Sequence, residues 1–371
     1  MTLKIDADFD GGNIIVDRAS IASADLRIRD DAGGRWFQWF YFRVDGAAGQ
    51  DLTLRITNAG ASAYPDGWPG YRACVSTDNE TWVRAETSYT SGVLGIRHKA
   101  ATDTLWFAYF APYDLARHQR LMTRADASDA TTVREIGRSV DGRCIETISI
   151  GTGPRQVWIL GRQHSGETMA SWWMEGALDA LLDPADAMAK ALLKTARLHI
   201  VPIVNIDGAA RGHLRGNAAG LDLNRQWHDP DPQTAPEVAC VLAAMDKTGC
   251  DFSLDVHGDE TLRHVFVDGS DSDHKSSPAQ TAGVEAFKQA LLKASPAFQT
   301  KVGYPATYGG DEAPGMATRA IARRFGAIGV TLEMPFGDSK EAPDPVADWS
   351  PQACKAMGRA SLGAILTTLN P

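Results

Sequence analysis

The sequence predicts an antiparallel β-sandwich over residues 1–115, followed over residues 116–371 by an α/β domain with a mostly parallel or mixed sheet. Three observations lead to this fold class. Short apolar segments separated by turn signals fill the first third of the chain, without a helical period. Apolar strands then alternate with helical stretches, as they do in α/β domains. The 371 residues also exceed the roughly 150 of an average single domain.

Short strands follow one another through the first domain. The densest is the segment WFQWFYFRV, whose aromatic and β-branched residues favour a strand. Turn signals such as Asp45-Gly46 and Pro65-Asp66-Gly67 separate the strands. In order, we expect strands at Asn13–Asp17, Leu26–Arg29, Trp36–Val44, Leu52–Thr57, Tyr71–Ser76, Thr81–Arg84, Gly92–His98 and Thr104–Tyr113.

Buried strands and helices alternate in the second domain, and the domain boundary lies between residues 113 and 125. Apolar residues dominate these strands, which is typical of buried strands in a mostly parallel or mixed sheet. We expect them at Ile145–Ile150, Val157–Leu160, Leu198–Val204, Phe252–Val256 and Ile328–Leu332. We expect helices at Thr168–Leu182, Ala235–Lys247, Ala279–Ala294, Pro314–Arg324 and Pro351–Leu369.

Composition excludes several classes of protein. Hydrophobic residues make up 44% of the chain and charged residues 22%, which is typical of a globular protein and excludes bulk disorder. The net charge of −9 disfavours nucleic acids and anionic membranes as partners. No window approaches the roughly 18 apolar residues of a membrane helix, and MTLKIDADFD does not resemble a signal peptide. The five cysteines lack CxxC spacing, so we expect free thiols and a cytoplasmic protein.

The turn after the strand Val157–Leu160 carries His164 and Glu167, three residues apart. This spacing brings an imidazole nitrogen and a carboxylate oxygen to one metal ion, and catalytic zinc takes three such ligands. His257 ends another apolar strand, so all three side chains meet at the carboxyl ends of strands. Each motif alone is weak, because His-x-x-Glu often occurs by chance and a lone histidine is more often structural.

Between the two metal motifs lies a loop rich in arginine, asparagine and glycine, from Val204 to Trp227. Glycine permits tight backbone paths, and arginine binds carboxylates through two parallel hydrogen bonds. Beside a metal, such a loop is suited to hold an anionic group. The alternative is a turn-rich loop whose arginines face solvent.

In this order, the motifs resemble those of the zinc metallocarboxypeptidases. They are the HxxE pair, NxDGxxRGxxR, GxDLNRxW, the later His-Gly and VTLEMPFG. Pro112-Tyr113 and the N-terminal sandwich resemble the cytosolic carboxypeptidase subfamily. The resemblance implies an α/β/α catalytic fold with one zinc ion per chain. It also implies hydrolysis of the C-terminal peptide bond of peptides or protein tails.

The resemblance implies a role for each matching residue. His164, Glu167 and His257 match the zinc ligands. Arg215 matches the arginine that polarises the scissile carbonyl and stabilises the oxyanion. Glu333 matches the general base, although a strand-end carboxylate paired with an arginine is the alternative interpretation.

Three further residues of the loop match substrate-binding and supporting positions. Asn224 and Arg225 match the pair that binds the terminal carboxylate of the substrate, which explains specificity for a chain end. Asp222 matches the carboxylate that orients the first zinc histidine.

Two positions depart from the family pattern or rest on thinner evidence. The family carries a tyrosine on a mobile loop before the base, and here Tyr308 is near that position without aligning securely. It contacts substrate or serves packing. The family's specificity position falls on Thr318, beside Arg319. An arginine in the side-chain pocket would favour C-terminal Glu or Asp, whereas the alternative is a solvated helix residue.

Two other functions remain compatible with these motifs. One is a zinc amidohydrolase that deacylates a small N-acyl amino acid, and the other is a non-catalytic module that binds protein C-termini. The intact GxDLNRxW motif, Glu333 and the N-terminal sandwich favour the carboxypeptidase. The sequence indicates neither an oligomeric state nor a role for the N-terminal domain.

Overall fold

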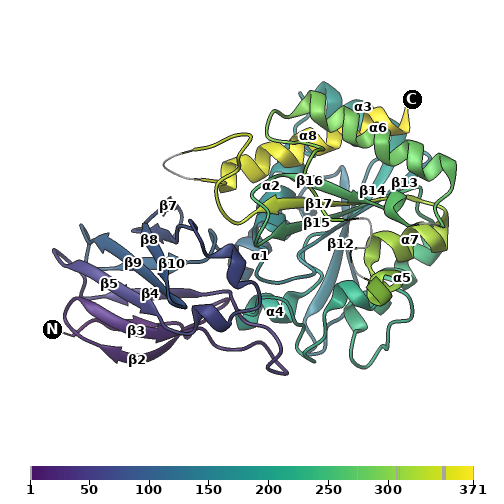
Figure 1. Cartoon of the computed structure of the whole chain (residues 1–371). Helices are drawn as coiled ribbons and strands as arrows, with labels where there is room; N and C mark the ends of the chain where they lie inside the picture. Colours follow the sequence, from purple (N-terminus) through teal and green to yellow (C-terminus); the bar gives the residue numbers. More distant parts are fainter. Residues whose placement is uncertain (1, 274, 306–307, 309, 345–347, 371) are drawn as a thin grey trace.

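Two five-stranded sheets occupy the N-terminal part of the chain, and a seven-stranded sheet with helices occupies the rest (Figure 1). The computed structural model describes residues 2–273, 275–305, 308, 310–344 and 348–370. The last strand of the N-terminal sheets ends at Ala108, and the first α-helix begins at Leu115. The predicted fold class, an α/β domain with a mixed sheet after an N-terminal β domain, is confirmed.

The N-terminal sheets face each other with alternating buried side chains. The first sheet contains β1 (Lys4–Asp6), β4 (Tyr41–Asp45), β10 (Leu105–Ala108), β6 (Cys74–Ser76) and β7 (Val83–Arg84) in spatial order. The second contains β2 (Ile15–Ala19), β3 (Ser23–Arg27), β5 (Asp51–Ile56), β9 (Val93–Lys99) and β8 (Glu86–Thr90). In β5, alternate residues Leu52, Leu54 and Ile56 are buried, as expected for a half-covered sheet.

One strand pair differs from the expected antiparallel arrangement. β3 and β5 are parallel, whereas the other pairs in both sheets are antiparallel. The reason is the connection between them, because the chain leaves β3, forms β4 in the other sheet and then returns as β5. Such a crossover allows parallel pairing, which a short hairpin does not.

The seven-stranded sheet positions the candidate site. Its spatial order is β11 (Thr131–Arg138), β12 (Cys144–Ile150), β14 (Ala196–Val201), β13 (Arg155–Gly161), β15 (Phe252–Asp259), β17 (Ile328–Pro335) and β16 (Phe266–Gly269). The four strands β14, β13, β15 and β17 are parallel. β12 pairs antiparallel with β14, β16 pairs antiparallel with β17, and β11 pairs antiparallel with β12. All eight residues of β15 are buried, including the polar Ser253, Asp255 and His257.

Helices cover both faces of this sheet (Figure 1). Alternate residues of β13 enter two different cores: Val157 and Ile159 join one, Trp158 and Leu160 the other. The first core includes α2 (Met169–Leu181), α3 (Ala187–Thr195), α6 (Pro278–Ala294) and α8 (Pro351–Leu369). The second includes α4 (Ile206–Arg211), α5 (Pro236–Thr248) and α7 (Ala317–Phe325). α1 (Leu115–Asp126) packs beside β11.

Short 3-10 segments complete the elements, at Ala59–Ala61, Pro65–Gly67, Leu223–Arg225, Ser270–Ser272 and Gly310–Gly315. The expected strand Thr104–Tyr113 ends at Ala108, because the carbonyls of Ala111 and Tyr113 accept side-chain hydrogen bonds instead of joining a sheet. The sequence analysis did not predict α1, α3, β11 or β16.

The described residues contain no helix that combines the length and the apolarity needed to cross a membrane. All five cysteines are free thiols, and Cys74, Cys250 and Cys354 are buried. Burial raises the pKa of the Cys250 thiol to about 12, so this side chain remains protonated and is packed as an apolar residue.

Candidate active site

The predicted metal ligands meet where two parallel strands end. His164 and Glu167 lie in the turn between β13 and α2, and His257 lies near the end of β15. β13 and β15 are neighbours, with Gly161 opposite Val256, so their carboxyl ends share one edge of the sheet. Among the described residues, this is the group of His and acidic side chains able to hold a metal, with its ligand atoms within 4.8 Å of one another.

The donor atoms fit a zinc ion. The Nδ1 atoms of His164 and His257 lie 3.2 Å apart, and Glu167 places its two oxygens 2.7 Å and 2.8 Å from them. Zinc bonds of about 2.0–2.1 Å in tetrahedral geometry separate neighbouring donors by roughly 3.3 Å. The site is buried and offers two nitrogens and one carboxylate, the donor set of many catalytic zinc sites.

Each metal-facing histidine is oriented by a carboxylate on its other nitrogen. Nε2 of His164 lies 3.0 Å from Asp222, and Nε2 of His257 lies 2.7 Å from Asp255. These contacts fix the ring orientations and direct both Nδ1 atoms toward the centre of the candidate metal site. Asp222 lies where the sequence predicted a supporting carboxylate. The sequence analysis did not single out Asp255, although it lies two residues before His257 in the same strand.

A strained turn holds the first two ligands. Arg162 follows β13 with a φ of 55°, which is unfavourable for a side chain other than glycine. Its buried guanidinium donates to the carbonyls of Ser165 at 2.8 Å and Tyr113 at 2.6 Å. Burial lowers the pKa of Arg162 to about 10. The predicted Pro112-Tyr113 segment therefore connects to the metal turn through this arginine.

Arg215 lies beside the metal ligands and is oriented by Asp222. Its Nε donates to the Asp222 carboxylate at 2.8 Å, and the side chain is almost entirely buried. Burial opposes the charge of Asp222, but Arg215 and His164 outweigh it and hold the pKa of this carboxyl well below its ordinary value. Asp222 therefore orients His164 and Arg215 at the same time.

The backbone around Arg215 is held from two sides. Asn205 donates from its amide to the carbonyls of Arg215 and Gly216, both at 3.2 Å. On the other side, the carboxylate of Asp31 accepts from the N–H groups of Leu214, Arg215 and Gly216 at 2.7–2.8 Å. Asp31 belongs to the N-terminal part of the chain, so that part directly supports the arginine loop.

Glu333 lies on β17, next to His257 on β15. Burial raises the pKa of Glu333 well above its ordinary value, and the nearby carboxylates raise it further, against the charge of His257. One carboxylate oxygen accepts from the Tyr304 hydroxyl at 3.1 Å. The other, Oε2, is buried and has no hydrogen-bond partner among the described residues, so it is available to a reacting group.

Two tyrosines line the pocket where the sequence predicted one. The ring of Tyr308 stacks on that of Tyr304, with centroids 3.8 Å apart and planes 9° apart. The Tyr304 hydroxyl donates to Asp259 at 2.7 Å as well as to Glu333. Tyr304 therefore has the closer contact with the predicted base, and the sequence analysis did not select it.

The predicted substrate-binding residues lie at different distances from the pocket. Asn224 and Arg225 line it, and the amide oxygen of Asn224 accepts from Ala317 N at 2.8 Å. Arg319 is not among the lining residues, because its buried guanidinium donates to the Tyr308 carbonyl at 3.0 Å and to Ser272 Oγ at 3.1 Å. It supports the wall behind Tyr308.

The pocket itself has a volume of about 140 Å³. It brings together the predicted metal ligands His164 and Glu167 with Arg215 and Glu333. Residues that the sequence analysis did not single out also line it: Tyr64, Asp259, Glu260, Asp268 and Tyr304. Tyr64 comes from the N-terminal part of the chain, and no local motif marks it.

Comparison with known families agrees with this geometry. The family model described as zinc carboxypeptidase matches residues 121–344. The chain belongs to the zinc carboxypeptidase family. A second model, described as the cytosolic carboxypeptidase N-terminal domain, matches residues 5–110. As a member of the family, the protein is a metallocarboxypeptidase and thus a hydrolase.

Relatives support the same membership. A protein of Zymomonas mobilis is 44% identical over 98% of this chain and 96% of its own length. Human cytosolic carboxypeptidase 6 is 29% identical over 72% of this chain, which spans 59% of that protein's length.

Solved structures of two bacterial metallo-carboxypeptidases are similar over almost the whole chain. One, from Burkholderia cenocepacia, is 38% identical, with a TM-score of 0.96 over 100% of this chain and 99% of the other. The other, from Pseudomonas aeruginosa in complex with (2-guanidinoethylmercapto)succinic acid, is 36% identical. Its TM-score is 0.94 over 99% of each chain. The two-part architecture is therefore shared with enzymes of this family.

Proposed function

We propose that this protein is a zinc-dependent exopeptidase that releases single C-terminal residues from peptides or protein tails. The observation that carries the proposal is the convergence of five side chains: His164, Glu167, His257, Arg215 and Glu333. They come from separate loops and strands and combine one metal-ligand set with one cation and one base. We propose one zinc ion per chain, bound by the two histidines and Glu167.

The chemistry of hydrolysis follows from these positions. When bound, zinc lowers the pKa of a water molecule and polarises the scissile carbonyl. Glu333 accepts the proton of the attacking water at its free Oε2 and delivers it to the leaving amine. Burial raises the pKa of Glu333, which makes its carboxylate a stronger proton acceptor for the first step. Arg215, oriented by Asp222, stabilises the oxyanion.

Specificity for a chain end would come from Asn224 and Arg225. Both line the pocket and offer donors for a terminal carboxylate, which only the last residue of a peptide carries. The Pseudomonas aeruginosa relative binds a succinic acid derivative, a molecule with carboxylates that such a pair would hold. A peptide with an amidated C-terminus should therefore resist cleavage.

For the side-chain preference, we propose C-terminal Glu or Asp, through the positive charge of Arg319. Arg319 reaches the pocket wall through Tyr308, and its charge opposes the rise that burial causes in the pKa of Asp268. Asp268 lines the pocket, so it is the competing determinant and would favour a basic residue. The two assignments differ in outcome. Loss of Glu cleavage in Arg319→Ala supports the first, and loss of Lys or Arg cleavage in Asp268→Asn supports the second.

We further propose that residues 1–115 and 116–371 form two domains and that the protein works in the cytoplasm. The free thiols suit a reducing compartment, and several relatives are named cytosolic carboxypeptidases. Contacts such as those of Asp31 with the arginine loop support a fixed relation between the two domains.

The test is mass spectrometry of a peptide library with varied C-terminal residues, incubated with zinc-loaded protein. We expect stepwise loss of single residues, abolished in Glu333→Gln and retained in Glu285→Gln, an exposed control on α6. The spectrum of trimmed ends decides between the two side-chain preferences. Turnover of N-acyl amino acids without peptide trimming would instead favour the amidohydrolase, and binding of tails without any hydrolysis would favour the non-catalytic module.

A further inference from the structure

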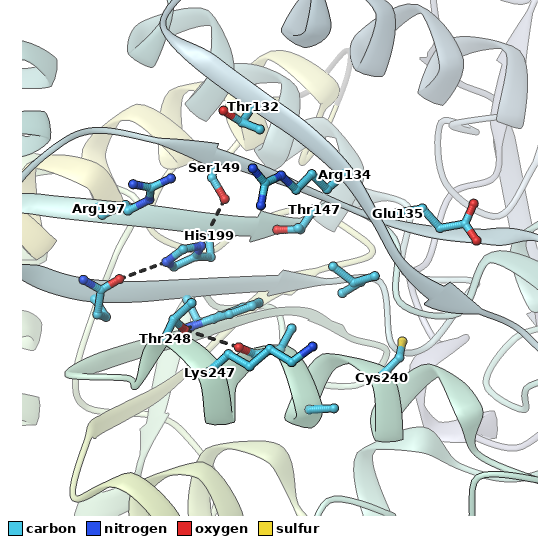
Figure 2. A pocket seen from close by; sticks show the side chains of 15 residues that line it. Thr132, Arg134, Glu135, Thr147, Ser149, Arg197, His199, Cys240, Lys247 and Thr248 are labelled. Atoms are coloured by element: carbon cyan, nitrogen blue, oxygen red, sulfur yellow. Dashed lines mark hydrogen bonds between the residues drawn. The ribbon is translucent and has the colours of Figure 1, made fainter.

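A second cavity lies between the sheet and α5, away from the active site (Figure 2). Its volume is about 590 Å³, against about 140 Å³ for the catalytic pocket, and the two share no lining residue. Its walls come from β11, β12, β13, β14 and α5. Trp158 and His199 lie in the middle of their strands, whereas the metal ligands follow the carboxyl ends.

Positive charge surrounds this cavity. Arg134 on β11, Arg197 on β14 and Lys247 on α5 line it, and all three are exposed. Figure 2 shows Arg134 approaching from β11 and Lys247 from α5 on the opposite side. None of the three forms an ion pair with another described residue. Glu135 also lines the cavity, but it pairs with Arg138 at 3.0 Å. Three uncompensated cations therefore face one space on a protein of net charge −9.

The floor of the cavity contains a buried hydroxyl without a partner. Thr147 is 6% exposed, lines the cavity, and its Oγ1 has no hydrogen-bond partner among the described residues. Buried polar atoms are nearly always paired in native structures, so this atom is suited to bind a polar group that enters the cavity. Figure 2 shows Thr147 beside Ser149 on the cavity side of β12.

The remaining floor is rigid, aromatic and uncharged. The ring of His199 stacks on that of Trp158, with centroids 4.7 Å apart and planes 22° apart. Its nitrogens contact Ser149 Oγ at 3.1 Å and Gln156 Oε1 at 2.9 Å. Burial lowers the pKa of His199 to about 4, so the ring is neutral at pH 7 and the positive charge comes from the rim.

We propose that this cavity binds a small organic anion, a phosphate- or polycarboxylate-bearing molecule of about nucleotide size. Arg134, Arg197 and Lys247 would contact the anionic group. Its organic body would lie against the apolar side chains Ile136 and Ala244. The volume lies within the range of about 300–1,000 Å³ typical of small-molecule sites. Because the cavity shares no residue with the catalytic pocket, this proposal stands independently of the proposed peptidase activity.

Isothermal titration calorimetry on the full chain tests the proposal with four probes: adenosine 5′-monophosphate, citrate, inorganic phosphate and adenosine. We expect saturable binding at one site per chain for the nucleotide or for citrate, which distinguishes a phosphate from a polycarboxylate ligand. Inorganic phosphate lacks the organic body and adenosine lacks the charge, so both should bind at least about tenfold more weakly. Absence of binding by both organic anions would overturn the proposal.

Variants then locate the bound probe. Arg197→Ala removes one cation, and Thr147→Val removes the hydroxyl at nearly constant volume; each should weaken binding about tenfold or more. Arg18→Ala, which removes an exposed arginine from β2, should leave affinity unchanged. Thermal unfolding checks that each variant is folded. If one of the two cavity variants is not folded, Lys247→Ala, on the exposed side of α5, is tested in its place. Binding that survives all the cavity variants would contradict this site.

Discussion

Asp31 provides the sharpest test of how the N-terminal part of the chain contributes to catalysis. It is 3% exposed, and its two oxygens accept three backbone hydrogen bonds around Arg215, at 2.7, 2.8 and 2.8 Å. Burial raises the pKa of Asp31, while these three N–H groups act in the opposite direction. The carboxylate thereby fixes the backbone from which the proposed oxyanion-binding guanidinium extends.

We expect Asp31→Ala to lower kcat/KM far more than its distance from the chemistry suggests. Hydrogen bonds to a charged group contribute about 1.5–3 kcal/mol each, so three of them hold the loop with several kcal/mol. A loop that relaxes moves Arg215 away from the oxyanion, and loss of one such donor costs about 10²–10³ in rate. In Asp31→Asn, one oxygen remains as an acceptor, so the expected loss is nearer tenfold, or about 1.4 kcal/mol.

The assay is kcat/KM for a peptide that the zinc-loaded wild type trims, measured by mass spectrometry beside thermal unfolding. The matched control is Asp30→Asn, because Asp30 is adjacent but exposed. Undiminished kcat/KM in Asp31→Ala, or an equal loss in the Asp30 control, would refute the reasoning. If Asp31→Ala does not fold, the graded loss in Asp31→Asn carries the test.

Three further predictions follow from the geometry. Removal of the metal by a chelator should lower the unfolding temperature, and added zinc should restore it. A ligand present at about 100 times its Kd adds about 2.7 kcal/mol to the free energy of unfolding. An unfolding temperature that the chelator does not change would contradict a bound metal. Tyr304→Phe removes a hydrogen bond that lowers the pKa of Glu333, so the acid limb of the pH profile of kcat/KM should move to higher pH; a shift to lower pH would oppose the assignment. Burial raises the pKa of Glu175, but its bonds to Arg117 and Lys355 outweigh this and hold it at about 2. This contribution to stability is present above the unfolded pKa of about 4.3 and is lost as pH falls toward 2. The free energy of unfolding, measured with urea at a series of pH values, should therefore fall less steeply with acid in Glu175→Gln than in the wild type. An equally steep fall in both would exclude that role.

Several features of the fold could be predicted from the sequence because they depend on neighbouring residues. Segments rich in apolar residues identified the central strands β13, β15 and β17, and glycine-containing turns separated the strands of the first domain. The β11 strand and α1 were not predicted, because most of their residues are polar: β11 has no buried residue, and α1 buries only His118, Leu121, Met122 and Ala125. Tertiary contacts stabilise these elements where local propensity does not mark them.

The candidate site likewise contains residues that the sequence predicted and residues that only the structure placed. The spacing of His164 and Glu167, and the placement of His257 at a strand end, are local properties, and parallel strands necessarily bring them to one edge of the sheet. The resemblance to the family then implied roles for Arg215 and Glu333. The sequence also suggested Arg319 as a pocket residue, but Arg319 does not line the pocket, and its guanidinium donates to the backbone carbonyl of Tyr308 instead.

The sequence by itself therefore determined the family, the fold class and a candidate metal-ligand set, since these depend on residue types at fixed spacings along continuous segments. Only the tertiary structure brought Tyr64 and Tyr304 into the pocket and assembled the cationic cavity beside α5. Asp30 and Asp31 show the physical reason. They are neighbours with the same side chain, yet one faces solvent and the other supports Arg215 from 184 residues away. Burial and partners, which packing alone supplies, give the second carboxylate its role.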